Sequence, residues 1–293
     1  MFGRAYSSNS LLRNREPVRV PGFTTDVFTD ETLRFVRRHA QQPWFVFLSF
    51  NAVHTPLEIS RAVADRIPAT VTDPQRRGYL ALLLGLDDSI GRLMQEVRSQ
   101  HPNTLVFFFS DNGGSGRKPF FAFNTAVNKP LRGDKGQLWE GGIRVPYFVS
   151  WPGHLPAGTV SEAPVSTLDI LPTACAVSGG QLPDGVEGVN LLPCLQGHTT
   201  AVPHDKLYWR FGPQRAIRAG RWKLVDARDF QLKTQTGWQL YDLESDPGET
   251  QDLAASQPQR VAELSTAWDE WNRQNISPLW KGTANEDPRG TGK

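Results

Sequence analysis

The longest helical pattern in the sequence lies between two short apolar segments, and this order restricts the possible folds more than any other feature. From about residue 73 to 99, apolar residues recur at intervals of three and four, which predicts a long amphipathic helix. Trp44–Phe50 before it and Leu105–Phe109 after it are apolar runs, as buried strands are. Strand, helix and strand in this order predict a right-handed parallel crossover. We therefore expect an α/β fold with a mixed, largely parallel sheet flanked by helices.

The remaining patterns predict two domains. A helix is expected from Thr29 to about Ala40, a third strand over Val145–Ser150, and a short helix over Ser166–Val177 that Pro172 interrupts. Beyond the turn-rich residues 179 to 197 the pattern changes to short strands and a final helix, at 207–210, 216–219, 222–225, 239–241 and 258–273. We therefore predict a larger domain over residues 1–199 and a smaller α+β domain over 200–293, with antiparallel strands and a terminal helix.

Polar and glycine-rich segments follow the strand that ends at Phe109. They read Ser110-Asp111-Asn112-Gly113-Gly114 and, further on, Gly133-Asp134-Lys135-Gly136. The Asp111 carboxylate and the Asn112 amide offer the oxygen ligands that Ca²⁺ or Mg²⁺ prefers. Lys135 offers a compact positive charge for an oxyanion, and ligands of α/β sheets bind beyond the carboxyl ends of the strands. The pattern predicts a site for a metal ion and a tetrahedral oxyanion.

Each of these residues also has a structural interpretation. Asp and Asn before Gly-Gly favour turns, and most lysines lie on the surface. Glu140 and Arg144 are expected to form an internal ion pair, and Asp88 is expected to pair with Arg92 one helical turn later. Lys129 and Arg132 are interpreted as structural or rim-forming rather than catalytic. Five histidines are interpreted as solvated, namely His39, His101, His154, His198 and His204. The aromatic residues Phe120, Phe121, Phe123 and Trp139 either line a pocket or pack internally.

The order SDNGG followed by NKPLRGDKGQLWEGGIRVP resembles the middle of a sulfatase of the arylsulfatase type, within the alkaline-phosphatase-like superfamily. The resemblance implies that Asp111 and Asn112 are two of the Ca²⁺ ligands and that Lys135 contacts the sulfate. It also implies a catalytic role for His54, which stands in an Ala-x-His-x-Pro setting and can assist the leaving group. Asp134 stands where many sulfatases have a small residue, so it adds a negative charge beside Lys135.

The resemblance implies Ca²⁺-dependent hydrolysis of sulfate monoesters by a formylglycine nucleophile. We expect that nucleophile to be absent here, because Cys175 heads Cys-Ala-Val-Ser-Gly and Cys194 heads Cys-Leu-Gln-Gly-His, neither of which fits the Cys/Ser-x-Pro/Ala-x-Arg pattern. The early Asp-Asp pair of related calcium sites is expected to be missing as well. The chain therefore resembles the C-terminal portion of a sulfatase, with little activity expected from it alone.

Two alternatives stay open at this point. A phosphomonoester or phosphonate hydrolase of the same fold could use the same metal pair and lysine, and a truncated or degenerate binding module could use neither. The implied partner is a small sulfate ester or a sulfated glycan, and the sequence does not distinguish between these substrates. Whether Cys175 and Cys194 form a disulfide is also open.

Charge and hydropathy exclude some classes of partner. Lys and Arg number 32 and Asp and Glu number 30, so a net charge of +2 gives no electrostatic case for nucleic acid or a membrane surface. No apolar run is long enough to span a membrane, and the first residues lack the pattern of a secretory signal. The resemblance implies a periplasmic or secreted location for the complete enzyme.

Overall fold

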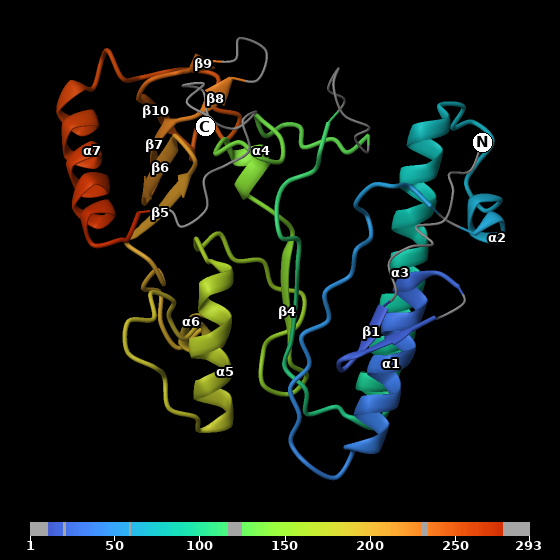
Figure 1. Cartoon of the computed structure of the whole chain (residues 1–293). Coiled ribbons are helices and arrows are strands. Elements are labelled where there is room, and N and C mark those ends of the chain that lie inside the picture. The colour runs from blue at the N-terminus through green and yellow to red at the C-terminus, as the bar shows by residue number, and fades with distance from the viewer. Residues whose placement is uncertain (1–10, 20–21, 59, 117–124, 230–233, 278–293) are drawn as a thin grey trace. The chain divides into compact units, whose positions relative to one another are not determined.

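The protein divides into two compact units in a computed structural model, which describes residues 11–19, 22–58, 60–116, 125–229 and 234–277 (Figure 1). The first unit contains Met1–Thr104 and Ser115–Val127, and the second contains Leu105–Gly114 and Asn128–Lys293. The domain boundary expected between residues 199 and 200 stays a prediction. None of the helices within the described ranges is long and apolar enough to cross a membrane.

Two packed helices form the centre of the first unit. These are α1 (Thr24–Arg38) and α3 (Pro74–Gln100), beside the hairpin of β1 (Leu11–Arg13) and β2 (Glu16–Val18) and the short α2 (Arg61–Ala64). The prediction of α3 is confirmed. Helix α1 is also present, but it begins at Thr24 rather than Thr29, because buried threonines extend its inner face. The Thr29 hydroxyl donates to the Thr25 carbonyl at 2.9 Å, which satisfies it inside the helix.

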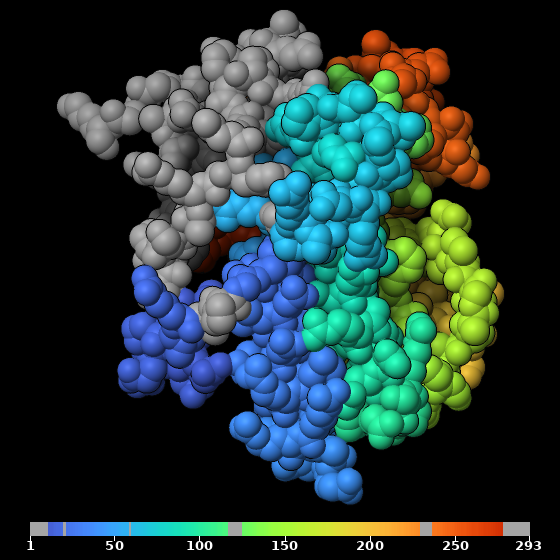
Figure 2. Space-filling model, turned by 90° about the vertical axis from the view of Figure 1, so that its right-hand side faces the viewer, coloured from blue at the N-terminus to red at the C-terminus, as the bar shows by residue number. Residues whose placement is uncertain are grey.

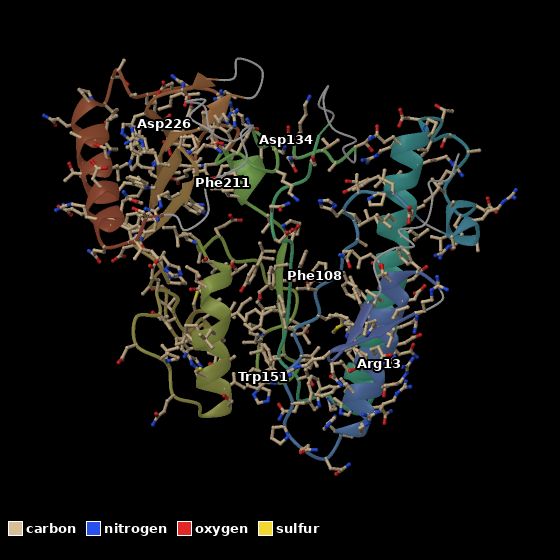
Figure 3. The ribbon with its side chains drawn as sticks, viewed as in Figure 1. Arg13, Phe108, Asp134, Trp151, Phe211 and Asp226 are labelled. Atoms are coloured by element: carbon tan, nitrogen blue, oxygen red, sulfur yellow. The ribbon has the colours of Figure 1, made fainter. Side chains whose placement is uncertain are left out.

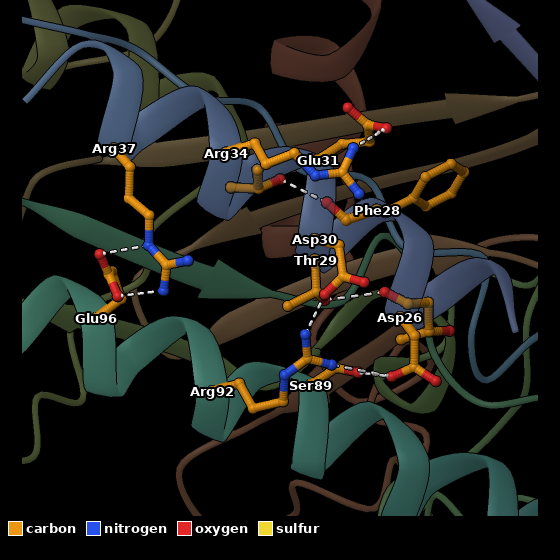
Figure 4. A network of polar contacts seen from close by, with 12 residues as sticks. Asp26, Phe28, Thr29, Asp30, Glu31, Arg34, Arg37, Ser89, Arg92 and Glu96 are labelled. Carbon is orange, nitrogen blue, oxygen red and sulfur yellow. Dashed lines mark hydrogen bonds and ion pairs between the residues drawn. The ribbon is translucent and has the colours of Figure 1, made fainter. Parts of the chain in front are cut away.

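Ion pairs join the exposed edges of α1 and α3, which run side by side in the space-filling view (Figure 2). Arg92 pairs with Asp26 and Asp30, and Arg37 donates to both carboxylate oxygens of Glu96 at 2.9 and 2.7 Å (Figure 4). The expected pairing of Asp88 with Arg92 was therefore wrong. Because α3 packs against α1, the Arg92 guanidinium pairs with carboxylates of α1. Asp88 pairs with Arg66 instead.

The first strands of the second unit pair in an antiparallel manner. Strand β3 (Val106–Phe109) runs against β4 (Tyr147–Ser150), with Phe108 opposite Phe148. Every strand pair that the structure describes is antiparallel, so the largely parallel sheet expected from the sequence is not seen in these ranges. Both strands were correctly predicted from their apolar runs.

The predicted strand over residues 44–50 was wrong. Half-buried and exposed residues alternate along this segment of the first unit, and Phe45 and Phe47 are 72% and 75% exposed. Alternation is the pattern of a strand, but a strand also needs a hydrogen-bonded neighbour. Within the described ranges no neighbouring strand pairs with residues 44–50, so the apolar pattern alone does not make a strand here.

A four-stranded antiparallel sheet forms the C-terminal part of the second unit. Its strands lie in the order β10 (Gln239–Asp242), β7 (Trp222–Asp226), β6 (Gln214–Ala219) and β5 (Lys206–Phe211). Helix α7 (Pro258–Arg273) covers one face, where Leu264 and Trp268 pack against Ile217, Leu224 and Leu240. These strands and this helix confirm the predicted C-terminal elements.

The other face of this sheet packs against the segment that precedes α4 (Glu140–Ile143). There Leu138 and Trp139 contact Ala216, Val225 and Tyr241. Figure 1 shows α7 on one side of the sheet and α4 on the other. Because side chains alternate between the faces of a strand, β7 contributes its even-numbered residues to the α7 side and its odd-numbered residues to the α4 side.

Shorter elements complete the second unit. They are η1 (Thr167–Asp169), α5 (Ile170–Ser178), α6 (Leu192–Leu195), β8 (Arg228–Asp229) and β9 (Thr234–Gln235). Pro172 does not interrupt its helix, contrary to expectation. It lies in the first turn of α5, where backbone N–H groups have no partner within the helix and a proline therefore removes no hydrogen bond.

The sequence suggested that His204 is solvated, and this was wrong. In the structure His204 pairs with a buried carboxylate. Its Nε2 lies 2.8 Å from Asp169 Oδ1, and its side chain is only 9% exposed. The same carboxylate accepts hydrogen bonds from the backbone N–H groups of Ser166 at 2.7 Å and Val189 at 2.9 Å. Asp169, which directly precedes α5, thus binds Val189 and His204 from the segment that follows this helix.

Acid is expected to weaken the four-stranded sheet through Asp242. Hydrogen bonds from Arg221 lower the pKa of Asp242 from 3.8 to about 2. A pKa that is lower in the folded than in the unfolded state stabilises the fold above about pH 4, and this stabilisation is lost as the pH falls through about 2. In Arg221→Gln, the free energy of unfolding should therefore depend less steeply on pH between 4 and 2. Urea denaturation followed by tryptophan fluorescence measures this slope, and an unchanged slope would contradict the assignment.

Candidate metal and oxyanion site

Two segments that are far apart in the sequence meet in one loop cluster of the second unit. Ser110–Gly114 leaves the end of β3, and its Gly113 N–H donates to the Gly142 carbonyl at 2.9 Å. The Lys135 N–H donates to the Gly114 carbonyl at 3.1 Å. The structure therefore brings the segment of Asp111 and Asn112 beside the backbone of Lys135, and the binding roles of the three residues stay predictions. Asp134, which precedes Lys135 in the sequence, is labelled in Figure 3.

Asn128 holds the two segments together from within. Its amide oxygen accepts from the Gly114 N–H at 2.9 Å, and its amide nitrogen donates to the carbonyls of Gly114 at 2.9 Å and Gly133 at 3.0 Å. No role was predicted for Asn128 from the sequence. Its place at the start of the NKPLRGDKG motif is the signal that could have identified it.

Backbone contacts at two glycines leave no room for a side chain. A Cβ atom on Gly113 would lie 1.8 Å from the Gly141 carbonyl oxygen, and one on Gly142 would lie 2.1 Å from the Gln137 carbonyl oxygen. Real Cβ atoms do not approach other atoms this closely, so both positions require glycine. These glycines therefore serve the close packing of the loop cluster.

Asp111 and Asn112 present oxygen donors at the edge of this cluster. The Asp111 carboxylate is exposed, and in the part of the chain that the structure describes it has no ion-pair partner. The Asn112 amide nitrogen donates to the Gly113 carbonyl at 3.0 Å, so the amide oxygen is the atom that remains for a ligand. This donor set fits a hard cation such as Ca²⁺.

Two oxygen ligands are fewer than the six to eight that Ca²⁺ takes. Among the residues whose positions are described, no group of three or more His, Cys, Asp or Glu side chains could hold a metal ion. Asp111 and Asn112 therefore fit part of a calcium site, and further oxygen ligands must join them.

Lys135 and Asp134 are held differently by the loop. Lys135 is half-buried, and its backbone lies between Gly133 and Gly136, both of which have positive φ angles. The carboxylate of Asp134 accepts from the Asn128 amide nitrogen at 3.4 Å, and its N–H donates to Gln137 Oε1 at 3.0 Å. The additional charge at position 134 thus belongs to the hydrogen-bond network of the loop.

Below the loop cluster lies a fully buried group of three charges. The Lys223 ammonium is 2.8 Å from Glu140 Oε1 and 2.8 Å from Glu249 Oε1, and none of the three side chains is more than 3% exposed. Burial raises the pKa of the Glu249 carboxyl, and the nearby Lys223 ammonium opposes that rise. The expected ion pair of Glu140 with Arg144 was therefore wrong, because Glu140 faces the sheet. Arg144 lies 3.9 Å from Glu162.

Sequence reasoning did not find Lys223 or Glu249. They lie 83 and 109 positions from Glu140, so no local spacing relates them to it. One signal was present: Lys223 is the charged residue between Trp222 and Leu224 in the strand predicted over residues 222–225, which is otherwise apolar. A lysine at such a position needs a buried partner.

Arg132 and Trp139 have structural roles. The Arg132 guanidinium lies 3.7 Å from the Trp139 ring centroid and donates to the Tyr241 hydroxyl at 3.2 Å and the Glu249 carbonyl at 3.0 Å. Trp139 is buried in the core beside Tyr241. This confirms the structural interpretation of Arg132 and the packing alternative for Trp139. Phe120, Phe121 and Phe123 lie outside the described residues.

His54 belongs to the first unit and is exposed there. Its Nδ1 lies 2.6 Å from the Thr55 carbonyl oxygen. Because a carbonyl only accepts, Nδ1 carries the hydrogen, and Nε2 is the nitrogen that remains for another group. Its convergence with Asp111, and its role in catalysis, stay predictions.

One serine does fit the nucleophile pattern, contrary to the expectation that the chain lacks it. The sequence Ser256-Gln257-Pro258-Gln259-Arg260 has the required letters. The structure makes this segment the start of α7: Pro258 is in the first turn, the Ser256 hydroxyl donates to the Leu253 carbonyl at 3.0 Å, and Arg260 stacks on Trp222. The neighbouring Leu253 packs on the α7 side of the sheet, opposite Trp139. The match is therefore a helix start that is remote from the loop cluster.

Cys175 and Cys194 are both free thiols.

Comparisons with known protein families agree with the motifs of the loop cluster. A family model described as sulfatase matches residues 2–180. A second model, described as the C-terminal part of N-sulphoglucosamine sulphohydrolase, matches residues 133–270. Together these matches include both the loop cluster and the four-stranded sheet.

Similar individual proteins carry sulfatase names as well. The chain is 30% identical over 210 residues to the uncharacterized sulfatase YdeN of Escherichia coli. This alignment covers 70% of this chain and 36% of YdeN. It is 33% identical over 227 residues to human arylsulfatase H, covering 74% of this chain and 38% of that protein. The chain thus spans little more than a third of these curated relatives.

A solved structure supports the similarity in three dimensions. The crystal structure described as Ps i-CgsB in complex with k-i-k-neocarrahexaose superposes with a TM-score of 0.83 at 29% sequence identity. The match covers 94% of this chain and 61% of that chain.

Proposed function

This chain belongs to the sulfatase family, whose members have the alkaline-phosphatase-like fold, and we propose that it contributes to the Ca²⁺-dependent hydrolysis of sulfate monoesters. The observation that carries the proposal is the pair of backbone hydrogen bonds, Gly113 to Gly142 and Lys135 to Gly114, that joins the Asp-Asn pair to the lysine loop. A sulfate ester needs positive charge around its oxygens, and this loop cluster combines oxygen ligands for a cation with a lysine.

Four residues would have separate roles in this hydrolysis, namely Asp111, Asn112, Lys135 and His54. Asp111 and Asn112 would hold Ca²⁺, which when bound neutralises charge on the sulfate oxygens. Lys135 would contact the sulfate as a point charge. His54 would assist the departing oxygen through Nε2, since Nδ1 is engaged by the Thr55 carbonyl.

The proposal includes a class of substrate and a sheet topology. The oligosaccharide in the similar crystal structure favours a sulfated glycan, with small sulfate esters as the other class. The largely parallel sheet expected from the sequence is part of the same proposal. The formylglycine nucleophile is expected to come from residues other than Ser256, because that serine lies just before α7 on the side of the sheet opposite Trp139.

Ligand binding is the direct test of the loop cluster. Millimolar Ca²⁺ with sulfate should raise the melting temperature of the full chain, because a ligand that binds only the folded state stabilises it. Asp111→Asn or Lys135→Met should remove this shift. The control variants Asp205→Asn and Lys206→Met remove the same charges at exposed positions and should retain it. Equal shifts in all five proteins would contradict the proposal, and a larger shift with phosphate than with sulfate would favour the phosphatase alternative.

Turnover of a chromogenic aryl sulfate is expected to be slow. With Ca²⁺ present, the full chain should hydrolyse the ester no faster than Lys135→Ala, because the described loop cluster contains no nucleophile of the formylglycine pattern. Release of the aryl alcohol, followed by absorbance, measures the rate. Hydrolysis well above that of Lys135→Ala, and abolished by a chelator, would show that the chain supplies its own nucleophile.

A further inference from the structure

The buried charges of Lys223, Glu140 and Glu249 lie directly beneath the loop cluster, and we propose that they position the Asp111–Asn112 and Lys135 segments for ligand binding. This inference rests on the proposed function in one respect, because the proposed function supplies the ligands, Ca²⁺ and sulfate, that those segments would bind. The three residues touch no ligand themselves and are positioning residues. Lys223 projects from the α4 side of the sheet, the face that also carries Val225 and Tyr241.

Glu249 contacts the chain on both sides of the lysine loop, at Arg132 before it and at Glu140 after it. Its Oε2 accepts from the Glu140 N–H at 2.6 Å, and its backbone carbonyl accepts from Arg132 Nη1 at 3.0 Å. It reaches both donors from a backbone with φ of +54°, which is uncommon for a residue other than glycine. Such a conformation costs on the order of 1–3 kcal/mol and persists where surrounding contacts hold it.

The partners of Glu249 lead directly to the candidate site. Arg132 offers its carbonyl to the Gly141 N–H at 2.6 Å, and the next residue, Gly142, accepts from Gly113 at 2.9 Å. Gly113 in turn follows Asn112. The hydrogen bonds of Gly141 with Arg132 and of Gly113 with Gly142 therefore connect Glu140 and Arg132 to the proposed metal ligands. If Glu140 or Arg132 moves, Gly113 and the adjacent Asn112 are expected to move as well.

The choice of charged residues also favours a positioning role. Well-packed apolar side chains often stabilise a core as well as a buried ion pair does, so a buried ion pair is weak evidence for a role in stability alone. Charged partners, however, disfavour other arrangements, because an arrangement that leaves a buried carboxylate or ammonium unpaired is costly. Here the paired arrangement fixes the turn at Glu140 to the sheet.

Amide hydrogen exchange of the full chain tests the proposal without any ligand. In Glu249→Gln, which keeps the shape of the side chain, the Gly113 and Lys135 amides should exchange at least tenfold faster relative to the β6 amides than in the parent. Glu140→Gln should give the same relative change. The control Leu264→Ala opens a cavity on the α7 side of the same sheet and should leave this ratio unchanged.

Two results would overturn the positioning role. One is an unchanged ratio in both carboxylate variants, and the other is an equal increase in Leu264→Ala. Ca²⁺ and sulfate titrations of the same proteins separate this inference from the proposed function. If the parent binds neither ligand, the proposed function fails while the exchange result still decides the positioning role. If the parent binds and Glu249→Gln binds at least tenfold more weakly, both are supported.

Discussion

Lys223→Met is expected to lower the free energy of unfolding of the second unit by about 3–5 kcal/mol, the usual cost of removing one partner of a buried ion pair. The methionine fills most of the space of the lysine stem, so the loss comes mainly from charge. Glu140 and Glu249 would remain beside each other at the α4 side of the sheet, with no ammonium between them. Buried carboxylates without a partner are among the costliest defects in a protein core.

Chemical denaturation of the parent and the variant measures this loss. The triple variant Lys223→Met, Glu140→Gln, Glu249→Gln is the matched control, because it removes all three charges with little change in volume. Its stability should lie much closer to that of the parent. A loss below about 1 kcal/mol for Lys223→Met alone would contradict the expectation, because it would mean that the carboxylates keep hydrogen-bond partners without the ammonium.

The loss should also depend on pH. Without the ammonium, burial raises the folded-state pKa of the Glu249 carboxyl further above its unfolded value, because Lys223 no longer opposes that rise. The folded state then binds more protons than the unfolded state between those values, so stability falls as the pH rises through that range. Lys223→Met should therefore be closest to the parent in mildly acidic buffer and furthest from it at alkaline pH.

Gly113→Ala is expected to abolish binding of Ca²⁺ and sulfate by the loop cluster. The new Cβ would lie 1.8 Å from the Gly141 carbonyl oxygen and 2.9 Å from Gly142 Cα, both of which are backbone atoms that cannot rotate away. The two segments must separate, which breaks the Gly113 to Gly142 hydrogen bond. Overpacking of this kind costs about 1–3 kcal/mol, and the lost hydrogen bond adds about 1 kcal/mol.

Calorimetric titration with Ca²⁺ and sulfate measures the effect on binding, and denaturation measures the effect on stability. Gly91→Ala is a suitable control, because nothing lies within 4 Å of its Cβ and it stands in the middle of α3. That change should stabilise the helix by roughly 0.5–1 kcal/mol and leave binding unaffected. Binding by Gly113→Ala equal to that of Gly91→Ala would refute the close packing of the loop cluster.

Periodicity in the sequence was sufficient for the elements whose buried face is continuous. Helix α3 and helix α7 were predicted almost to the residue, and strands β5, β6, β7 and β10 were found from short apolar runs between turns, whereas β8 and β9 were not predicted. Periodicity misled at residues 44–50, where an alternating apolar segment has no strand beside it in the described ranges. It also placed the start of α1 too late, since buried threonines look polar in the sequence.

The chemistry of the candidate site was predicted from the sequence, but the residues that support the site were not. The residue types at Asp111, Asn112 and Lys135, together with the motif around them, predict a site for a cation and an oxyanion, because ligand chemistry is a property of the side chain, and this assignment stays a prediction. The partners of Glu140, Arg92 and His204 were decided only by the tertiary structure. The reason is physical: spacing along the chain determines which face of an element is buried, but which charge meets another across 83 residues depends on how strands and loops pack against each other.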